Sequence, residues 1–276
     1  MAVVPSSELD MSLGVLLIAI FFNTYLYGLV TYQFARYVTI KFNDPLWMKG
    51  FVLAMFLLDS VHSAAIIYMA YYLCVSTYGQ PEALGFALWP YQFTPLSVAI
   101  IALMTHLFLT KRIYSLTQSL LLAGGLLFLA FATFGVGIAS AALAWTMPTL
   151  LEQAALVPHV TAWFAMSFAM DFILAGTLIY TLSRSRTGIA RTDTLLFRLI
   201  KGAINTGLFA AMFNMGALLS FRFGQTTNFA AFFANPIGRV YSNTLLASLL
   251  DRAEMQNLLR GPAGLESNSR SHVSRS

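Results

Sequence analysis

Seven apolar stretches, each long enough to cross a membrane, constrain the fold more than any other feature of the sequence. They fall at 12–34, 48–72, 92–113, 119–145, 157–182, 195–221 and 229–250. A helix rises about 1.5 Å per residue, so about 20 apolar residues cross the roughly 30 Å of bilayer hydrocarbon. Backbone polar groups in lipid must pair within their own segment, and the alternation typical of barrel strands is absent. The sequence therefore predicts an all-α, polytopic membrane protein with a bundle of seven transmembrane helices.

The composition agrees with a membrane protein. Hydrophobic residues make up 58% of the chain and charged residues 10%, whereas a soluble domain carries about 25% charged residues. We expect one membrane domain at 12–250, preceded by an extracellular segment at 1–11 and followed by a cytoplasmic segment at 251–276. Because 1–11 contains Glu8 and Asp10 but no Lys or Arg, it lacks the basic start of a signal peptide, and we expect the first stretch to be retained as a span.

The basic residues orient the predicted bundle. Of the 16 Lys and Arg residues, 14 flank one side of the predicted spans, Arg222 lies on the other side, and Arg239 lies within the last span. Basic residues near span ends favour the cytoplasmic side of a membrane. We therefore expect the N-terminus outside the cell and the C-terminus in the cytoplasm, with the plasma membrane as the location. After the last span, we expect a short amphipathic continuation and then a disordered, Ser-rich tail.

The largest cluster of positive charge is the predicted cytoplasmic loop at 183–193, which contains Arg184, Arg186 and Arg191. Each Lys or Arg near an anionic inner leaflet gains about 1 kcal/mol. Anionic inner-leaflet lipid is therefore the expected partner of this loop, and a cytoplasmic protein is the alternative. The other basic residues are dispersed over several loops, so no nucleic-acid partner is expected.

Three charged residues fall inside predicted spans, where each costs roughly 2.5 to 3.5 kcal/mol on insertion scales. They are Asp59, Asp171 and Arg239, and counting along the helices places all three near the middle of the bilayer. His62 shares a helix face with Asp59, and two amides lie at similar depth or one turn away. We hypothesise a buried polar centre in which Asp59 or Asp171 pairs with Arg239; its candidate residues are Asp59, His62, Asp171, Asn205, Arg239 and Asn243. The alternative is that these residues only fix the helix register.

The sequence gives little support for enzyme activity or for a bound cofactor. The four His residues, His62, His106, His159 and His272, lie at different predicted depths or in the tail, and Cys74 is the only cysteine, so no zinc site is expected. His106 is expected to be a packing residue whose hydrogen bonds are satisfied. Motifs of serine hydrolases and nucleotide-binding loops are absent, and the last span lacks the Lys that would bind retinal. We expect no enzyme activity and no cofactor.

Three segments resemble a known family. They are LLDSVHSA at 57–64, the run from AMDFILAG to NTGLFAA at 169–211, and GRVYSNTLLASLLDR at 238–252. Together they resemble a large family of seven-span membrane proteins from mushroom-forming fungi, which is classed as a domain of unknown function. The resemblance implies a fold and a membrane location but no activity. The chain departs from the usual end of the last motif, Leu-Asn-Ala-Arg, where it has Leu249, Leu250, Asp251 and Arg252.

Two functions remain open at the level of the sequence. The first is a receptor-like protein that senses a ligand and contacts a cytoplasmic partner. The second is a transporter or proton-linked carrier that uses the charged residues midway across the membrane. Inverted repeats, which many carriers show, are not visible in this sequence, so sensing is favoured.

Overall fold

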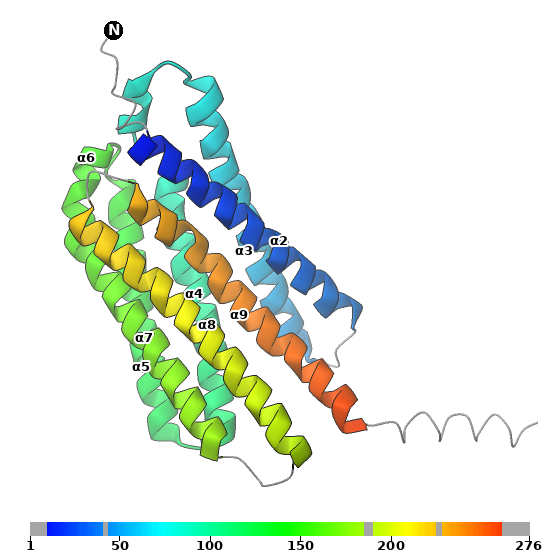
Figure 1. Ribbon diagram of the computed structural model, residues 1–276. Helices are drawn as coiled ribbons and strands as arrows, with labels where there is room; N and C mark the ends of the chain where they lie inside the picture. Colours follow the sequence, from blue (N-terminus) through cyan, green and yellow to red (C-terminus); the bar gives the residue numbers. More distant parts are fainter. Residues whose placement is uncertain (1–9, 41–43, 185–189, 225–227, 261–276) are drawn as a thin grey trace, which may run out of the picture.

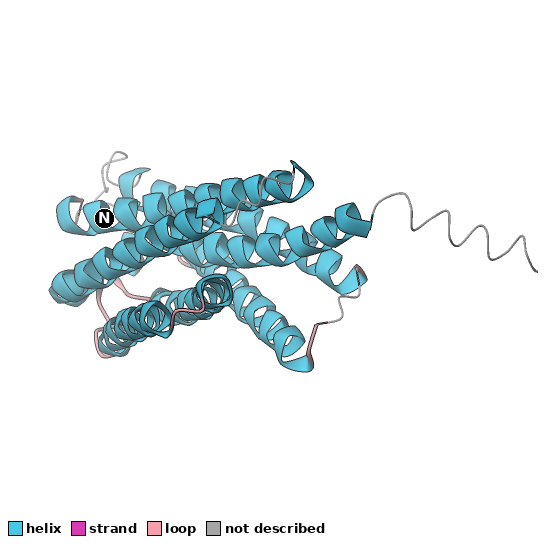
Figure 2. Cartoon of the chain, turned by 90° about the horizontal axis from the view of Figure 1, so that it is seen from below, coloured by secondary structure: helices cyan, strands magenta, loops and turns pink. Residues whose placement is uncertain are grey.

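The computed structural model describes residues 10–40, 44–184, 190–224 and 228–260. Within these ranges, the side chains of residues 81, 82, 150, 190–206 and 252–260 lie outside the description. The prediction of an all-α fold is confirmed for the described residues, since Figure 2 shows helices and loops but no strand among them. Seven helices are long: α2 (Val15–Thr39), α3 (Leu46–Tyr71), α4 (Trp89–Thr117), α5 (Leu120–Trp145), α7 (Val157–Arg184), α8 (Ala190–Phe223) and α9 (Phe229–Arg260).

Each of the seven predicted stretches corresponds to one long helix. The largest difference in helix bounds is at the end of the last helix, since α9 continues to Arg260 and the predicted span ends at 250. The predicted amphipathic continuation therefore belongs to the same helix as the last predicted span. Its side chains from 252 onward, and the tail at 261–276, lie outside the described residues.

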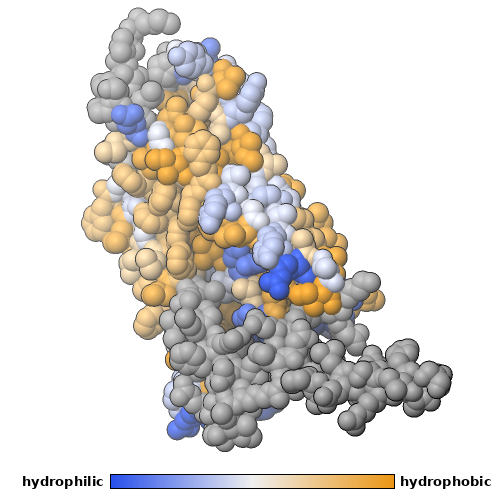
Figure 3. Space-filling model, turned by 45° about the vertical axis from the view of Figure 1, so that its right-hand side comes forward, coloured by the Kyte–Doolittle hydropathy of each residue, from blue (hydrophilic) through white to orange (hydrophobic). Residues whose placement is uncertain are grey.

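The surface of the bundle is apolar over a wide area. Figure 3 shows hydrophobic side chains spread over much of the described part of one face, and exposed large residues include Phe21, Leu121, Phe128 and Phe172. Within the described residues, five helical segments are long and apolar enough to cross a membrane, and a shorter apolar one spans Gly207–Phe223. Such a surface is what lipid contact requires. The protein is thus a polytopic membrane protein, and the crossing of all seven helices remains a prediction.

Helix α9 lies in the middle of the bundle. It contacts α2 on one side and α8 on the other, and it also contacts α4 and α3. Figure 1 shows α9 running between α2 and α8, with α5 and α7 on the far side of α8. The middle of α9 is therefore covered by other helices on several sides, and residues 235–242 are all buried.

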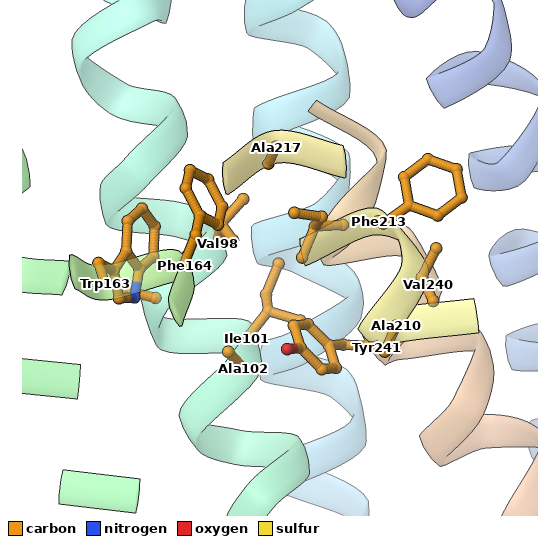
Figure 4. Packing of buried hydrophobic residues seen from close by; sticks show 12 residues of the cluster. Val98, Ile101, Ala102, Trp163, Phe164, Ala210, Phe213, Ala217, Val240 and Tyr241 are labelled. Carbon is orange, nitrogen blue, oxygen red and sulfur yellow. The ribbon is translucent and has the colours of Figure 1, made fainter. Parts of the chain in front are cut away.

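A cluster of apolar and aromatic side chains packs α4, α7, α8 and α9 together. Figure 4 shows Trp163 and Phe164 of α7 beside Val98 of α4, with Phe213 and Tyr241 on the other side of the cluster. Helix α5 approaches closely at Gly137, where an added Cβ would lie 2.7 Å from the indole nitrogen of Trp163. Only glycine allows this approach.

Hydrogen bonds between connecting segments tie together the end of the bundle where α4, α7 and α9 begin. The backbone nitrogen of Ala87 donates to Pro148 over 2.9 Å. The side-chain amide of Asn228, just before α9, donates to the Ser12 carbonyl over 2.9 Å. These bonds join segments that precede α2, α4 and α9 and the segment that follows α5. We call this the closed end of the bundle.

Candidate functional site

Arg239 is the centre of a buried hydrogen-bonded network between α9 and α3. Its side chain and that of Asp59 are both fully buried, and the guanidinium forms an ion pair with the Asp59 carboxylate. The other terminal nitrogen of Arg239 donates to the Asp59 carbonyl over 3.0 Å, to Nδ1 of His62 over 2.7 Å and to Oγ of Ser63 over 3.1 Å. His62 and Ser63 lie three and four positions after Asp59 on α3, so one helix face presents all three side chains to the guanidinium.

The hydrogen bonds around His62 define its tautomer. Arg239 can only donate, so Nδ1 of His62 accepts and the proton lies on Nε2. Nε2 is 3.0 Å from Oγ1 of Thr94, and the Thr94 hydroxyl itself donates to the Pro90 carbonyl over 2.8 Å. The Thr94 oxygen therefore accepts from His62. A continuous chain of bonds leads from Arg239 on α9, through His62 on α3, to Thr94 in the second turn of α4.

Helix α2 covers the remaining side of Arg239. The Tyr27 ring lies 5.9 Å from the guanidinium carbon, within the range of a cation–π interaction. The Asn243 amide donates to the Arg239 carbonyl over 2.8 Å and to the Leu26 carbonyl over 3.4 Å, so it joins α9 to α2 without touching the carboxylate. We call Tyr27, Asp59, His62, Ser63, Thr94 and Arg239 the Arg239 network.

Asp171 belongs to a second, separate network. One carboxylate oxygen is 3.2 Å from Nε2 of His106. The other accepts from the Asn214 amide over 2.7 Å and from the Tyr241 hydroxyl over 2.8 Å. In the part of the chain that the structure describes, the partners of this carboxylate are thus an imidazole, an amide and a phenol. We call these four residues, from α4, α7, α8 and α9, the Asp171 network.

The two networks meet on α9. Arg239 and Tyr241 are two positions apart, so they point to different sides of the helix. Arg239 faces α3 and α2, whereas Tyr241 faces α4, α7 and α8, as the hydrogen bonds above show. Movement of α9 therefore requires changes in both networks.

Two cavities adjoin the networks. The large cavity has a volume of about 250 Å³ and lies at the closed end of the bundle; Thr94 of the Arg239 network is part of its wall. The small cavity, of about 50 Å³, lies beside Asp171 and Tyr241 and extends to Arg112, Ser248 and Asp251. Each network thus has its own adjacent space.

The expected residues of one polar centre are distributed over the two networks. Asp59, His62 and Arg239 lie together, whereas Asp171 lies in the other network and does not pair with Arg239. Asn243, another candidate, lies one turn after Arg239, and its amide donates to the carbonyls of Leu26 and Arg239. Asn205 lies within α8, but its side chain is outside the description.

In the predicted basic loop, Arg184 ends α7 and lies over the Tyr180 ring at 5.2 Å. Arg186 lies outside the described residues. Arg191 lies in the first turn of α8, and its side chain is outside the description.

Sequence reasoning did not place six residues of the networks: Tyr27, Ser63, Thr94, His106, Asn214 and Tyr241. His106 was expected to be a packing residue with a hydrogen-bond partner, but that partner, Asp171, was not identified. Asn214, Thr94 and Ser63 are polar residues in apolar stretches, and their burial is the signal that they have polar partners. The partner of each could not be deduced, because it comes from a different helix.

In the described residues, no group of three or more His, Cys, Asp or Glu side chains is arranged to hold a metal ion.

Among known proteins, the chain shows similarity to one protein family. No curated protein and no solved structure matches the chain. Residues 167–254 match the model of a family described as a family of unknown function, DUF6534. The matched segment includes Asp171, Asn214, Arg239 and Tyr241, and so contains three of the four residues of the Asp171 network as well as the guanidinium of the other. From the middle of α7 into the last part of α9, the chain is similar to this family of unknown function.

Proposed function

We propose that the protein is a receptor-like, ligand-sensing integral membrane protein in which the large cavity receives the ligand and α9 transmits its presence. The observation that carries the proposal is the position of Thr94. This residue is part of the cavity wall and is also hydrogen-bonded to His62 of the Arg239 network. A ligand that displaces the Thr94 side chain changes the bond to His62 and, through it, the bond to Arg239.

The coupling needs a buried and inflexible connection, and the Arg239 network has these properties. The side chains of Asp59, His62 and Arg239 are fully buried, and hydrogen bonds in a medium of low dielectric are strong. A small displacement at one end of such a network is therefore expected to shift the helix at the other end. Because α9 also carries Tyr241, the shift would reach the Asp171 network and the small cavity.

The proposed topology places the closed end and the large cavity outside the cell. All seven long helices cross the plasma membrane in this proposal, and the basic residues between helices face the cytoplasm. The far end of α9 and the loop that contains Arg184, Arg186 and Arg191 then lie at the inner leaflet. Anionic lipid is the proposed partner of this loop, and a cytoplasmic protein would receive the signal. The proposal involves no catalysis.

The alternative function, a proton-linked carrier, is favoured by a different observation. Asp59 and Asp171 are buried carboxylates near the middle of their helices, and Asp171 lies on the wall of the small cavity. Buried ionisable residues in membrane proteins often mark ion or proton paths. In this alternative, Asp171 would bind and release the transported proton.

A flux measurement separates the two functions. The purified full chain is reconstituted in proteoliposomes with an internal pH-sensitive dye, and a proton gradient is imposed. Sensing predicts the same leak as in protein-free liposomes. Protein-dependent flux that disappears in Asp171→Asn, with the variant still folded, would support the carrier and contradict sensing.

The coupling itself is tested by filling the large cavity from a helix other than α9. Ala144 of α5 is part of the cavity wall, and Ala142 on the exposed face of the same helix provides the matched control. We expect Ala144→Phe, but not Ala142→Phe, to change amide hydrogen exchange in the 241–251 segment of α9 at least twofold in nanodiscs. Thr94→Val should remove this response. An unchanged α9 in the filled protein would contradict the proposal.

A further inference from the structure

From the walls of the large cavity we infer its ligand class: a compact, uncharged and mainly apolar organic molecule that carries one carbonyl or hydroxyl oxygen. The inference rests on the proposed function for the role of the cavity. The evidence for the ligand class does not depend on that role, because it comes from the charge, polarity and size of the cavity.

The charge of the ligand follows from the wall. None of the described residues that line the large cavity is Asp, Glu, Lys, Arg or His. An ion entering this space would lose its hydration and gain no partner of opposite charge, which is very unfavourable. The nearest network charges, Asp59 and Arg239, already neutralise each other behind the wall. Anionic and cationic ligands are therefore excluded from this cavity.

The apolar body of the ligand is indicated by the side chains of α4, α7 and α8. Val98, Trp163, Phe164 and Phe221 lie on the wall, and Figure 4 shows the first three gathered on one side of the buried cluster. Trp163 and Phe164 stack with ring centroids 5.0 Å apart, and Phe164 and Phe221 stack at 5.7 Å. Packed aromatic walls of this kind hold a rigid apolar body with little change of their own structure.

The oxygen atom is indicated by Asn235 of α9. Its side chain lies on the cavity wall and is 4% exposed. Within the described part of the chain, its amide nitrogen has no hydrogen-bond partner. An unpaired buried N–H is costly, and an acceptor oxygen on the ligand would satisfy it. Since Asn235 is one turn before Arg239, this bond would also join the ligand directly to the helix that transmits the signal.

The size of the ligand follows from the volume of about 250 Å³. An apolar cavity of about 150 Å³ holds benzene, whereas pockets for drug-sized molecules begin at about 300 Å³. The ligand is therefore larger than a single benzene ring and smaller than most drugs. A substituted monocyclic ketone or alcohol has these properties.

The test compares four molecules with the same ring and substituents: menthone, menthol, menthane, which lacks oxygen, and the menthylammonium cation. Binding is measured to the full chain in nanodiscs, with protein-free nanodiscs to subtract partitioning into lipid. We expect menthone and menthol to bind at least tenfold more tightly than menthane, and the cation to show no saturable binding. Ala144→Phe should abolish binding, whereas Ala142→Phe should leave it unchanged.

The role of Asn235 is tested with Asn235→Leu, which keeps the approximate volume of the side chain. Menthone and menthane should bind this variant with affinities within twofold of each other. Asn23→Leu is the matched control, because Asn23 is a buried residue of α2 that is not on the cavity wall, and it should keep the tenfold preference. Both variants are first checked for wild-type thermal unfolding, and Asn235→Ala, which also lacks a side-chain donor, replaces the leucine variant if that one does not fold.

The experiments distinguish failure of the inferred ligand class from failure of the sensing function. Equal binding of menthone and menthane to the wild type, preferential binding of the cation, or no saturable binding in the set would overturn the inferred ligand class. Selective binding of menthone that depends on Asn235 but leaves hydrogen exchange in α9 unchanged would uphold the class and contradict the sensing function.

Discussion

The Arg239 network and the Asp171 network meet on helix α9 at nearly the same depth, but they stabilise a buried carboxylate in different ways. Asp59 has a guanidinium partner, so the charge of one side chain is balanced by the other. Asp171 is hydrogen-bonded to side chains from three other helices and has no Lys or Arg partner among the described side chains. The first network thus depends on charge, and the second depends on directed hydrogen bonds.

This difference has a consequence for movement of α9. An ion pair weakens gradually with distance, because Coulomb energy falls as the inverse of the separation. Hydrogen bonds from an amide and a hydroxyl fail within a fraction of an ångström and a few tens of degrees. When α9 shifts, we therefore expect the ion pair between Arg239 and Asp59 to persist. The hydrogen bonds of Asn214 and Tyr241 to Asp171 should break first.

The largest expected effect comes from removing one partner of the ion pair. Asp59→Asn leaves the Arg239 guanidinium buried without a carboxylate, which is expected to lower the free energy of unfolding by about 3–5 kcal/mol. Unfolding by a denaturing detergent, followed by circular dichroism, measures the change. Adding Arg239→Met to remove the second charge should restore much of the lost stability. A double variant that is less stable than Asp59→Asn would contradict the dominance of charge in this network.

The same substitution at the second carboxylate should cost less. Asp171→Asn keeps one acceptor oxygen for Tyr241 or Asn214 and leaves no buried cation unpaired, so we expect a loss of about 1–2 kcal/mol in the same unfolding experiment. A loss as large as that of Asp59→Asn would show that a positive charge balances Asp171, as a protonated His106 would, and the comparison would then be wrong.

The smallest effect is expected at the junction with the large cavity. Thr94→Val removes the acceptor of the His62 N–H and a donor to Pro90 while keeping the shape of the side chain, and the expected loss is about 0.5–1.5 kcal/mol. Ser140→Ala is the control, since Ser140 also lies on the cavity wall but bonds only to the Val136 carbonyl of its own helix. The Thr94 variant should alter the response of α9 to cavity filling, and the Ser140 variant should not.

The helices could be predicted from the sequence to within a few residues at most ends, because lipid requires each span to be apolar and to satisfy its own backbone. Span length and composition are local properties, so the stretch at 157–182 corresponds to Val157–Arg184. The common face of Asp59 and His62 was also predictable, because it depends only on the helical repeat.

The partners of the buried polar residues could not be predicted in the same way. Whether Asp59 or Asp171 meets Arg239 depends on the rotation of α9 and on which helices pack beside it. Depth alone does not distinguish the two carboxylates, and Arg239 and Tyr241 differ only in the side of α9 to which they point. The large cavity was equally invisible in the sequence, because its wall combines residues from five segments that are far apart along the chain.

The most direct test of the connection between the large cavity and α9 is the nitrogen-15 NMR spectrum of the histidine rings in nanodiscs. His62 should show a protonated Nε2 and an unprotonated, hydrogen-bonded Nδ1. Filling the large cavity with Ala144→Phe should shift the Nε2 signal of His62, because Thr94 is its partner. Ala142→Phe should leave the spectrum unchanged. A proton on Nδ1 of His62, or a His62 signal that does not respond to the filled cavity, would contradict the account.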